Sequence, residues 1–286
     1  MDTPDTLLNT LSLERLETNL FRGQSPGGGG GPRIFGGQVI AQSLLAAYET
    51  VEGRVCHSLH CYFIRPGEPL TPIIFDVDRS RDGGSFTTRR VIAIQNGRQI
   101  FNLAASFQTP EEGFEHQSQM PPATDPDSLP DELAERARYM ENASPAAREM
   151  MLRPRPIEMR GVDGDPFYGG DRTEGRSAAW FRSAVEIPSD PRMHQVILAY
   201  ASDMNMLSTA MRPHGVFWDT PGLQHASLDH AMWFHRPTNF NDWHLYAQDS
   251  PSASGARGFV RGEIYDRAGR LVASVAQEGL LRQRAP

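Results

Sequence analysis

Lysine is absent from this sequence of 286 residues, and all 28 basic residues are arginine. Its absence excludes Schiff-base and pyridoxal-phosphate chemistry and the Walker-type phosphate loop, because each of these requires a lysine. The 35 acidic residues give a formal net charge of -7, so no excess of positive charge is available for a nucleic-acid backbone. We therefore expect no nucleic-acid partner, although arginine could still bind the phosphate groups of a small ligand.

Cysteines and long apolar runs are also scarce. The 2 cysteines, Cys56 and Cys61, are too few for a disulfide scaffold, and their spacing with the neighbouring histidines fits no standard zinc pattern. No stretch reaches the ~20 apolar residues of a membrane-spanning helix, and residues 1–5 do not resemble the start of a signal peptide. The sequence predicts a cytoplasmic protein with reduced thiols, no membrane span, no metal and no cofactor.

The chain contains an internal repeat. Residues 63–66 read Phe-Ile-Arg-Pro and are answered by Phe-His-Arg-Pro at residues 234–237, while residues 97–104 are answered by residues 269–276. The two matches occur in the same order and at nearly the same offset, which indicates two copies of one structural unit. We predict an α+β architecture in which the two units place their sheets side by side.

Hydrophobic periodicity predicts the elements of each unit. We expect helices at residues 7–21, 35–48 and 193–211, and strands at residues 57–65, 73–80, 85–95, 99–108, 177–187, 227–235, 243–248, 256–265 and 270–281. The glycine run at residues 27–31 is expected to be a loop, because no strand precedes it as in a dinucleotide fingerprint. The domains are placed at residues 1–118 and 176–286, with a connector at residues 119–175 in which few elements are expected.

One carboxylate lies on an apolar helical face. Val196, Ala199, Met206 and Leu207 lie at helical spacing from Asp203, so the Asp203 side chain projects from the face expected to be buried. Burial of a carboxylate costs several kcal/mol unless it is paired, and it raises the pKa. Asp203 is therefore a candidate general base, the alternative being a rotated helix on which it is solvated.

The two copies differ at this position. Aligning residues 38–40 with residues 195–197 places Ala46 opposite Asp203, as expected if a duplicated scaffold holds a single site. A second polar side chain, Gln277, lies in the otherwise apolar row of the last strand. Its amide could hold a water or a carbonyl group, or it could be a hydrogen-bonded core amide.

A Ser-His-Asp triad is suggested by Ser227, Asp229 and His230, which lie close together in one expected strand. Strand alternation places Ser227 and Asp229 on one face, ~7 Å apart, and turns His230 to the other face. The sequence also lacks the G-x-S-x-G nucleophile elbow. We therefore expect no triad within this strand, although Ser227 could donate a hydrogen bond to a water held elsewhere.

A set of short motifs runs in order through both halves of the chain: Leu20-Phe21-Arg22-Gly23-Gln24, Phe35-Gly36-Gly37-Gln38, Phe63-Ile64-Arg65-Pro66-Gly67, Met232-Trp233-Phe234-His235-Arg236-Pro237, Ser254 with Arg257-Gly258, and Val275-Ala276-Gln277-Glu278-Gly279. In these motifs the chain resembles acyl-CoA thioesterase II, the TesB family. The resemblance covers almost the whole chain and weakens over residues 109–175.

The resemblance implies a double hotdog fold, in which each repeat is an antiparallel sheet wrapped around a long central helix. It also implies a catalytic set of Asp203, Ser227 and Gln277, where many bacterial members have threonine in place of Ser227. We expect hydrolysis of fatty acyl-CoA thioesters by direct attack of a water, without a covalent intermediate. A homo-oligomer is expected by analogy with other hotdog proteins.

The sequence also suggests which residues contact the substrate. The developing oxyanion requires fixed hydrogen-bond donors, and the backbone N–H groups of Gly36 and Gly37 at the start of the first long helix are of the right type. Phe35 and Arg257, which belong to the same motifs, are expected to contact the acyl-CoA substrate, and its CoA phosphates are expected near arginines.

Two other functions remain open. An enoyl-CoA hydratase or dehydratase of the same fold requires an Asp and a His in a shared site, and no histidine is convincingly placed near Asp203. A non-catalytic acyl-CoA binding protein would bury Asp203, Ser227 and Gln277 without use, which is costly. Hydration of enoyl-CoA without CoA release, or saturable binding without thiol release, would identify the one or the other.

Overall fold

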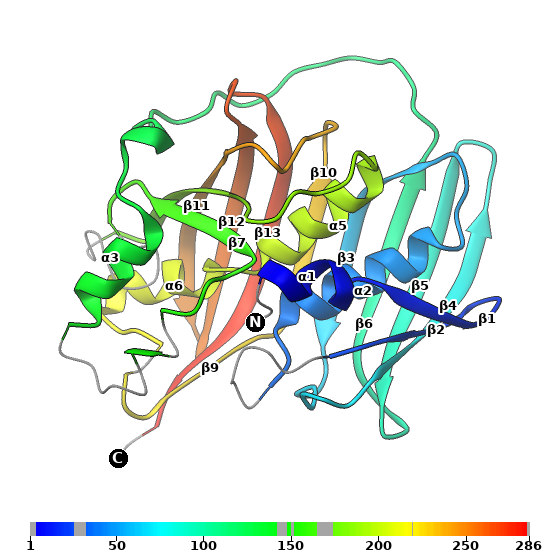
Figure 1. Cartoon of the computed structure of the whole chain (residues 1–286), viewed down its shortest axis with the longest axis horizontal. Helices are drawn as coiled ribbons and strands as arrows, with labels where there is room; N and C mark the ends of the chain where they lie inside the picture. The colour runs from blue at the N-terminus through cyan, green and yellow to red at the C-terminus, as the bar shows by residue number, and fades with distance from the viewer. Residues whose placement is uncertain are drawn as a thin grey trace.

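The computed structural model describes residues 4–25, 33–141, 148–149, 152–164, 174–218 and 220–284, and the glycine run at residues 27–31 lies outside these ranges. Within them the chain forms a 13-stranded sheet, and all the strand pairs described below are antiparallel. Figure 1 shows the central helices lying together across one face of this sheet.

The first half of the chain contributes one helix-and-sheet unit. Its elements are α1 (Pro4–Thr10), β1 (Leu13–Glu17), β2 (Leu20–Gly23), α2 (Gly36–Tyr48), β3 (Val55–Phe63), β4 (Ile73–Asp82), β5 (Phe86–Gln95) and β6 (Arg98–Gln108). The strands alternate in burial, as in β5, because one face packs on α2 and the other faces outward.

The second half repeats this arrangement. After η1 (Pro126–Ser128) and α3 (Glu132–Tyr139), its elements are β7 (Ile157–Gly161), β8 (Arg176–Ser183), α5 (Pro191–Ser202), α6 (Met206–Met211), η2 (Arg212–His214), β9 (Leu223–Ser227), β10 (Asp229–Phe234), β11 (His244–Ser254), β12 (Arg257–Asp266) and β13 (Leu271–Gln283). No element was expected at β7, which pairs with β8 at the edge of the sheet.

The two units meet at the centre of the sheet. The strand order is β1-β2-β4-β5-β6-β3-β10-β13-β12-β11-β8-β7, with β9 paired to β13. At the junction between β3 and β10, Cys61 lies opposite His230 and Leu59 lies opposite Met232. The predicted side-by-side pairing of two repeats is confirmed, and the architecture is the α+β double hotdog.

The helices α2 and α5 pack against each other in the middle of the molecule. Small side chains allow the close approach, since a Cβ added at Gly37 would lie 2.2 Å from the carbonyl oxygen of Tyr200. At the other end of α2 the Tyr48 hydroxyl donates a hydrogen bond to Gln195 of α5. The start of α2 therefore lies beside the end of α5, where Asp203 is found.

The single helix predicted at residues 193–211 is wrong, because the chain breaks it after Ser202. Asp203 is the C-terminal cap of α5, and Asn205 adopts a left-handed backbone conformation with φ 67° before α6 begins. Asparagine tolerates this conformation better than most residues. Asp203 thus lies in a two-helix junction and not within a continuous helix.

The helix predicted at residues 7–21 is also wrong beyond Thr10. The later part of this segment forms the hairpin of β1 and β2, and β2 pairs with β4, where Phe21 lies opposite Phe75. Pairing with a sheet edge and burial of Phe21 against the core outweigh the helical spacing of the leucines.

The strand predicted at residues 227–235 divides at Leu228. The Leu228 N–H donates to the carbonyl oxygen of Glu278 in β13, while the Leu228 carbonyl oxygen accepts from Phe63 at the end of β3. Ser227 in β9 pairs with Gly279 and Ala231 in β10 pairs with Ala276, both in β13, so the register shifts by one residue between β9 and β10. The alternation count that spans residue 228 is therefore invalid.

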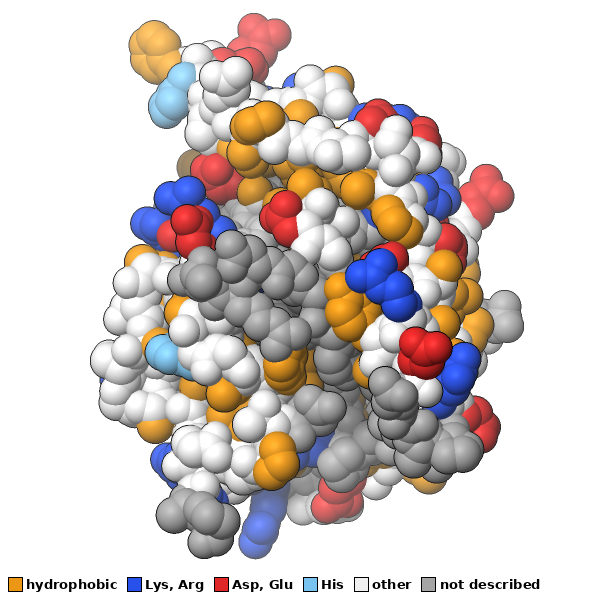
Figure 2. All heavy atoms as spheres, turned by 90° about the vertical axis from the view of Figure 1, so that its left-hand side faces the viewer, with side chains coloured by type: hydrophobic (Ala, Val, Ile, Leu, Met, Phe, Trp, Pro, Cys, Tyr) orange, Lys and Arg blue, Asp and Glu red, His pale blue; other side chains and the backbone are white. Residues whose placement is uncertain are grey.

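The surface mixes charges of both signs. On the face shown in Figure 2, arginine side chains and acidic side chains are interspersed. The helices in the described ranges include none that is both long and apolar enough to cross a membrane.

Candidate active site

Asp203 is buried at the junction of α5 and α6, with 9% of its surface exposed. Its Oδ2 atom lies against Gly36, where an added Cβ would be 2.6 Å from that oxygen. Burial raises the pKa of Asp203 to about 7, although hydrogen bonds from Ser227, Gln277 and the Gly37 backbone N–H act to lower it. A carboxyl with a pKa near neutrality can exchange protons with a water at physiological pH.

Ser227 and Gln277 converge on this carboxylate from two neighbouring strands. The Ser227 hydroxyl donates to Asp203 Oδ1 at 3.1 Å, and Gln277 Nε2 donates to Ser227 Oγ at 3.0 Å. β9 and β13 are paired with Ser227 opposite Gly279, so the sheet register places both side chains at the Asp203 turn. The structure thus brings together the three residues that the sequence selected.

Sequence reasoning missed His230. Its Nδ1 atom lies 2.6 Å from Gln277 Oε1, and its Nε2 atom lies 2.9 Å from Ser202 Oγ. The ring is 1% exposed, and burial lowers its pKa to about 4, so the imidazole is neutral. Alternation within β10 alone was the usable signal, because His230 shares the buried face with Met232 and Phe234.

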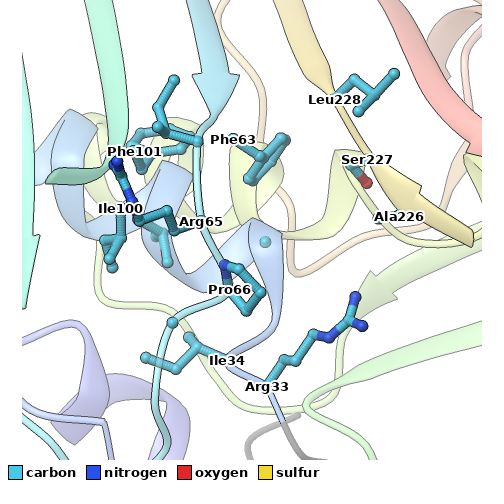
Figure 3. A pocket seen from close by; sticks show the side chains of 14 residues that line it. Arg33, Ile34, Phe63, Arg65, Pro66, Ile100, Phe101, Ala226, Ser227 and Leu228 are labelled. Atoms are coloured by element: carbon cyan, nitrogen blue, oxygen red, sulfur yellow. The ribbon is translucent and has the colours of Figure 1, made fainter.

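A pocket of about 320 Å³ opens next to this cluster. Figure 3 shows apolar side chains, including Phe63 and Phe101, gathered on one side of it, with Ser227 on the other. Gly36 and Val39 of α2 belong to its wall, and Arg33 and Arg65 are its cationic side chains. Both arginines are exposed to solvent, which suits a pocket that is apolar inside and cationic outside.

Only some of the other residues predicted to contact the substrate line this pocket. Gly36 lines the pocket, whereas the Gly37 N–H is engaged with Asp203. Phe35 packs edge-on against Tyr200 with ring centroids 5.0 Å apart. Arg257, at the start of β12, donates to Glu278 at 2.8 Å, and neither it nor Phe35 is among the described residues that line this pocket. Substrate contact by these two residues stays a prediction.

The cysteines are not part of a described metal cluster. Cys56 and Cys61 are free and buried, and burial raises the pKa of both thiols. Over the described ranges, no three His, Cys, Asp or Glu side chains are grouped so that they could hold a metal ion. The Cys61 thiol instead contacts the His230 carbonyl oxygen at 3.2 Å, within the central strand pair.

Comparison with known proteins places the chain in one family. The family model described as acyl-CoA thioesterase matches residues 152–280, and that described as acyl-CoA thioesterase N-terminal domain matches residues 24–108. Acyl-CoA thioesterase 2 of Haemophilus influenzae is 38% identical over 282 residues, covering 98% of this chain and 98% of its own.

Two further relatives agree. Human acyl-coenzyme A thioesterase 8 is 38% identical over 294 residues, which is 98% of this chain and 90% of the relative. The crystal structure of an acyl-CoA thioesterase II, TesB2, from Mycobacterium marinum has a TM-score of 0.78 and 41% identity to this chain, covering 96% of this chain and 98% of the other.

The fold and these matches define a double-hotdog thioester hydrolase. The chain belongs to the acyl-CoA thioesterase family and is of the TesB, or thioesterase II, type. The resemblance seen in the sequence motifs is thereby confirmed.

Proposed function

We propose that this protein hydrolyses fatty acyl-CoA thioesters to the free acid and CoA, with Asp203 as the general base that activates water. The observation that carries the proposal is a buried carboxyl with a pKa of about 7, held by Ser227 and Gln277 beside a largely apolar pocket. Membership of the family supports acyl-CoA as the substrate class.

The proposed reaction begins with a water at Asp203. The carboxylate takes a proton from this water while the oxygen attacks the thioester carbonyl carbon. The resulting tetrahedral intermediate collapses with cleavage of the carbon–sulfur bond, and the proton on Asp203 can then neutralise the departing thiolate. Ser227 and Gln277 hold the carboxylate by donating hydrogen bonds, so that Oδ2 faces Gly36 and the pocket wall.

The oxyanion requires a donor that is not already in use. Gly37 donates to Asp203 in this structure, so the Gly36 N–H, in the first turn of α2, is the better candidate of the two expected glycines. A first-turn N–H has no acceptor within its own helix, and the positive end of the helix dipole favours a developing negative charge. Gly36 also lines the pocket, as an oxyanion donor must.

The hydratase alternative is disfavoured by His230. A hydratase histidine must exchange a proton with the substrate, but both ring nitrogens of His230 are already paired, with Gln277 and with Ser202. The proposed hydrolase predicts CoA release from saturated and enoyl thioesters alike. Hydration of an enoyl-CoA without release of thiol would favour the alternative.

Other features of the proposal follow from the sequence. We assign residues 1–118 and 176–286 to two hotdog repeats and residues 119–175 to the connector, with the catalytic set in the second repeat. A cytoplasmic location and a homo-oligomeric state stay predictions, which gel filtration and cell fractionation can test.

The direct test is thiol release from palmitoyl-CoA by Asp203→Ala and Asp203→Asn. We expect kcat to fall by at least about 10²-fold in both, because the general base is removed. Asp229→Asn is a matched control, since Asp229 is partly buried and accepts a hydrogen bond from the Glu278 N–H that asparagine can also accept. Folded Asp203 variants with activity within a few-fold of wild type would refute the mechanism.

A further inference from the structure

The polar cluster continues beyond the three proposed catalytic residues and returns to its starting point. Ser202 contacts His230, His230 contacts Gln277, Gln277 contacts Ser227, and Ser227 contacts Asp203. Ser202 and Asp203 are adjacent in the chain, at the end of α5. These four contacts and the chain link between Ser202 and Asp203 therefore form a closed circuit that joins the helix end, β10, β13 and β9.

The orientation of the Gln277 amide is decisive for this circuit. Its Nε2 must face Ser227 and Asp203, because only the amide nitrogen can donate to the hydroxyl oxygen and the carboxylate. The reverse orientation has nearly the same shape, but it would direct Oε1 at the Asp203 carboxylate. Packing alone cannot distinguish the two orientations, so a specific hydrogen-bond partner for Oε1 has to do so.

His230 provides that partner. Gln277 Oε1 can only accept, so the 2.6 Å contact requires a proton on His230 Nδ1. A neutral imidazole protonated at Nδ1 must accept at Nε2, and the Ser202 hydroxyl, at 2.9 Å, is the donor there. The Ser202 hydroxyl also donates to the Ala199 carbonyl oxygen at 2.9 Å, so its single proton is shared between that oxygen and His230 Nε2.

The ring is kept away from the substrate by its surroundings. His230 is 1% exposed and does not line the described pocket. The Cys61 thiol contacts the backbone carbonyl oxygen of His230, and the Tyr246 hydroxyl donates to the Ser202 carbonyl oxygen at 2.9 Å. Along the hydrogen bonds, Gln277 thus separates the imidazole from Ser227, which lines the pocket.

We propose that His230 is a positioning residue that fixes the Gln277 amide, and through it Ser227 and the Asp203 carboxylate, in the orientation required for hydrolysis. The inference rests on the proposed role of Asp203 and Gln277. It adds an interaction that acts on kcat through Gln277, since the ring is buried and does not line the described pocket.

Three variants of His230 test the proposal with palmitoyl-CoA. His230→Leu removes the donor at similar volume and is expected to lower kcat about 10- to 100-fold, with KM changed less than about threefold. His230→Asn places an amide nitrogen at the same number of bonds from Cβ as Nδ1, and it should recover most of the lost kcat. His230→Gln, whose nitrogen lies one bond further out, should recover less.

A double-mutant cycle separates positioning from a general structural role. In a Gln277→Ala background the amide is gone, so His230→Leu should lower kcat by no more than about twofold further. Effects of Gln277→Ala and His230→Leu that multiply would overturn the inference, as would a His230→Leu enzyme with wild-type kcat. If Asp203→Asn and Gln277→Ala themselves stay active, the proposed function fails first, and the two failures are thus distinguishable.

Nitrogen NMR of the wild-type enzyme tests the tautomer without any substitution. We expect the His230 Nδ1 to carry the proton and Nε2 to be unprotonated between pH 6 and 8. A spectrum with the proton on Nε2 would overturn the inference, because the Gln277 Oε1 would then have no donor. This measurement also remains decisive if His230→Leu fails to fold.

Discussion

Replacing Asp203 by asparagine is expected to stabilise the protein above neutral pH and to abolish its hydrolytic activity. Asparagine keeps the shape of the side chain and one of the two acceptor oxygens that Ser227, Gln277 and Gly37 contact, but it cannot ionise. The wild-type enzyme must hold a charge in a buried position to act as a base. The expected gain in stability is therefore the free energy that wild type spends on burying this charge.

The size of the effect follows from the pKa of Asp203. Burial raises this pKa from 3.8 to about 7, and one pKa unit is worth about 1.36 kcal/mol. The stability due to the protonated carboxyl is complete below about pH 4 and is lost as the pH rises through about 7. The total loss is on the order of 4 kcal/mol, of which about 2 to 3 kcal/mol falls between pH 5 and pH 8.

Urea unfolding of wild type and Asp203→Asn at pH 5 and pH 8 measures this linkage. Comparing the variant with wild type at each pH cancels the contributions of the other titrating groups. The free energy of unfolding of the variant, relative to wild type, should increase by about 2 to 3 kcal/mol from pH 5 to pH 8. A difference that is the same at both pH values would refute the raised pKa and with it the reasoning from burial.

Three further predictions concern catalysis. The wild-type kcat/KM should rise with pH along an acid limb with an apparent pKa of about 7, because Asp203 must be ionised to accept a proton; a limb below pH 5 would speak against this base. Gly36→Ala should lower kcat more than tenfold, since the added Cβ would lie 2.6 Å from Asp203 Oδ2. The control Gly84→Ala should have a kcat within about twofold of wild type, because a Cβ at Gly84 would meet nothing within 4 Å. Ser227→Ala should lower kcat about tenfold or more. Ser227→Thr should retain most of the wild-type kcat, because threonine keeps the hydroxyl that donates to Asp203. Equal losses of kcat in both variants would show that the hydroxyl is not required.

Much of the fold was predictable from local pattern. The strands at residues 73–82, 86–95 and 98–108 follow the alternation of their side chains and the Asn96-Gly97 turn, and the repeat predicted that two such sheets join. The hairpin at residues 13–23 was not predictable in this way, because its burial depends on pairing with β4. The break at Asn205 depends on one left-handed residue, to which helical periodicity is insensitive.

The candidate site was predictable where the sequence pattern showed correctly which side chains share a buried face. Asp203 and Gln277 were found because each is polar in an apolar row, and they do meet at Ser227. His230 was excluded because the alternation was counted across Leu228, where the pairing with β13 shifts by one residue between β9 and β10. The alternation of side chains predicts which face a residue lies on only within one continuous strand. Beyond an irregularity such as Leu228, a side chain can lie on either face of the sheet.

The central claim is that Asp203 acts as a base on water and does not itself attack the thioester. A single turnover of palmitoyl-CoA in H₂¹⁸O, with enzyme in excess, tests it most directly. Direct attack by water predicts palmitic acid that carries one ¹⁸O from the first turnover and an Asp203 peptide of unchanged mass. Attack by the carboxylate, followed by attack of water on Asp203, would instead give unlabelled acid and an Asp203 peptide that is heavier by one ¹⁸O, and this result would contradict the account.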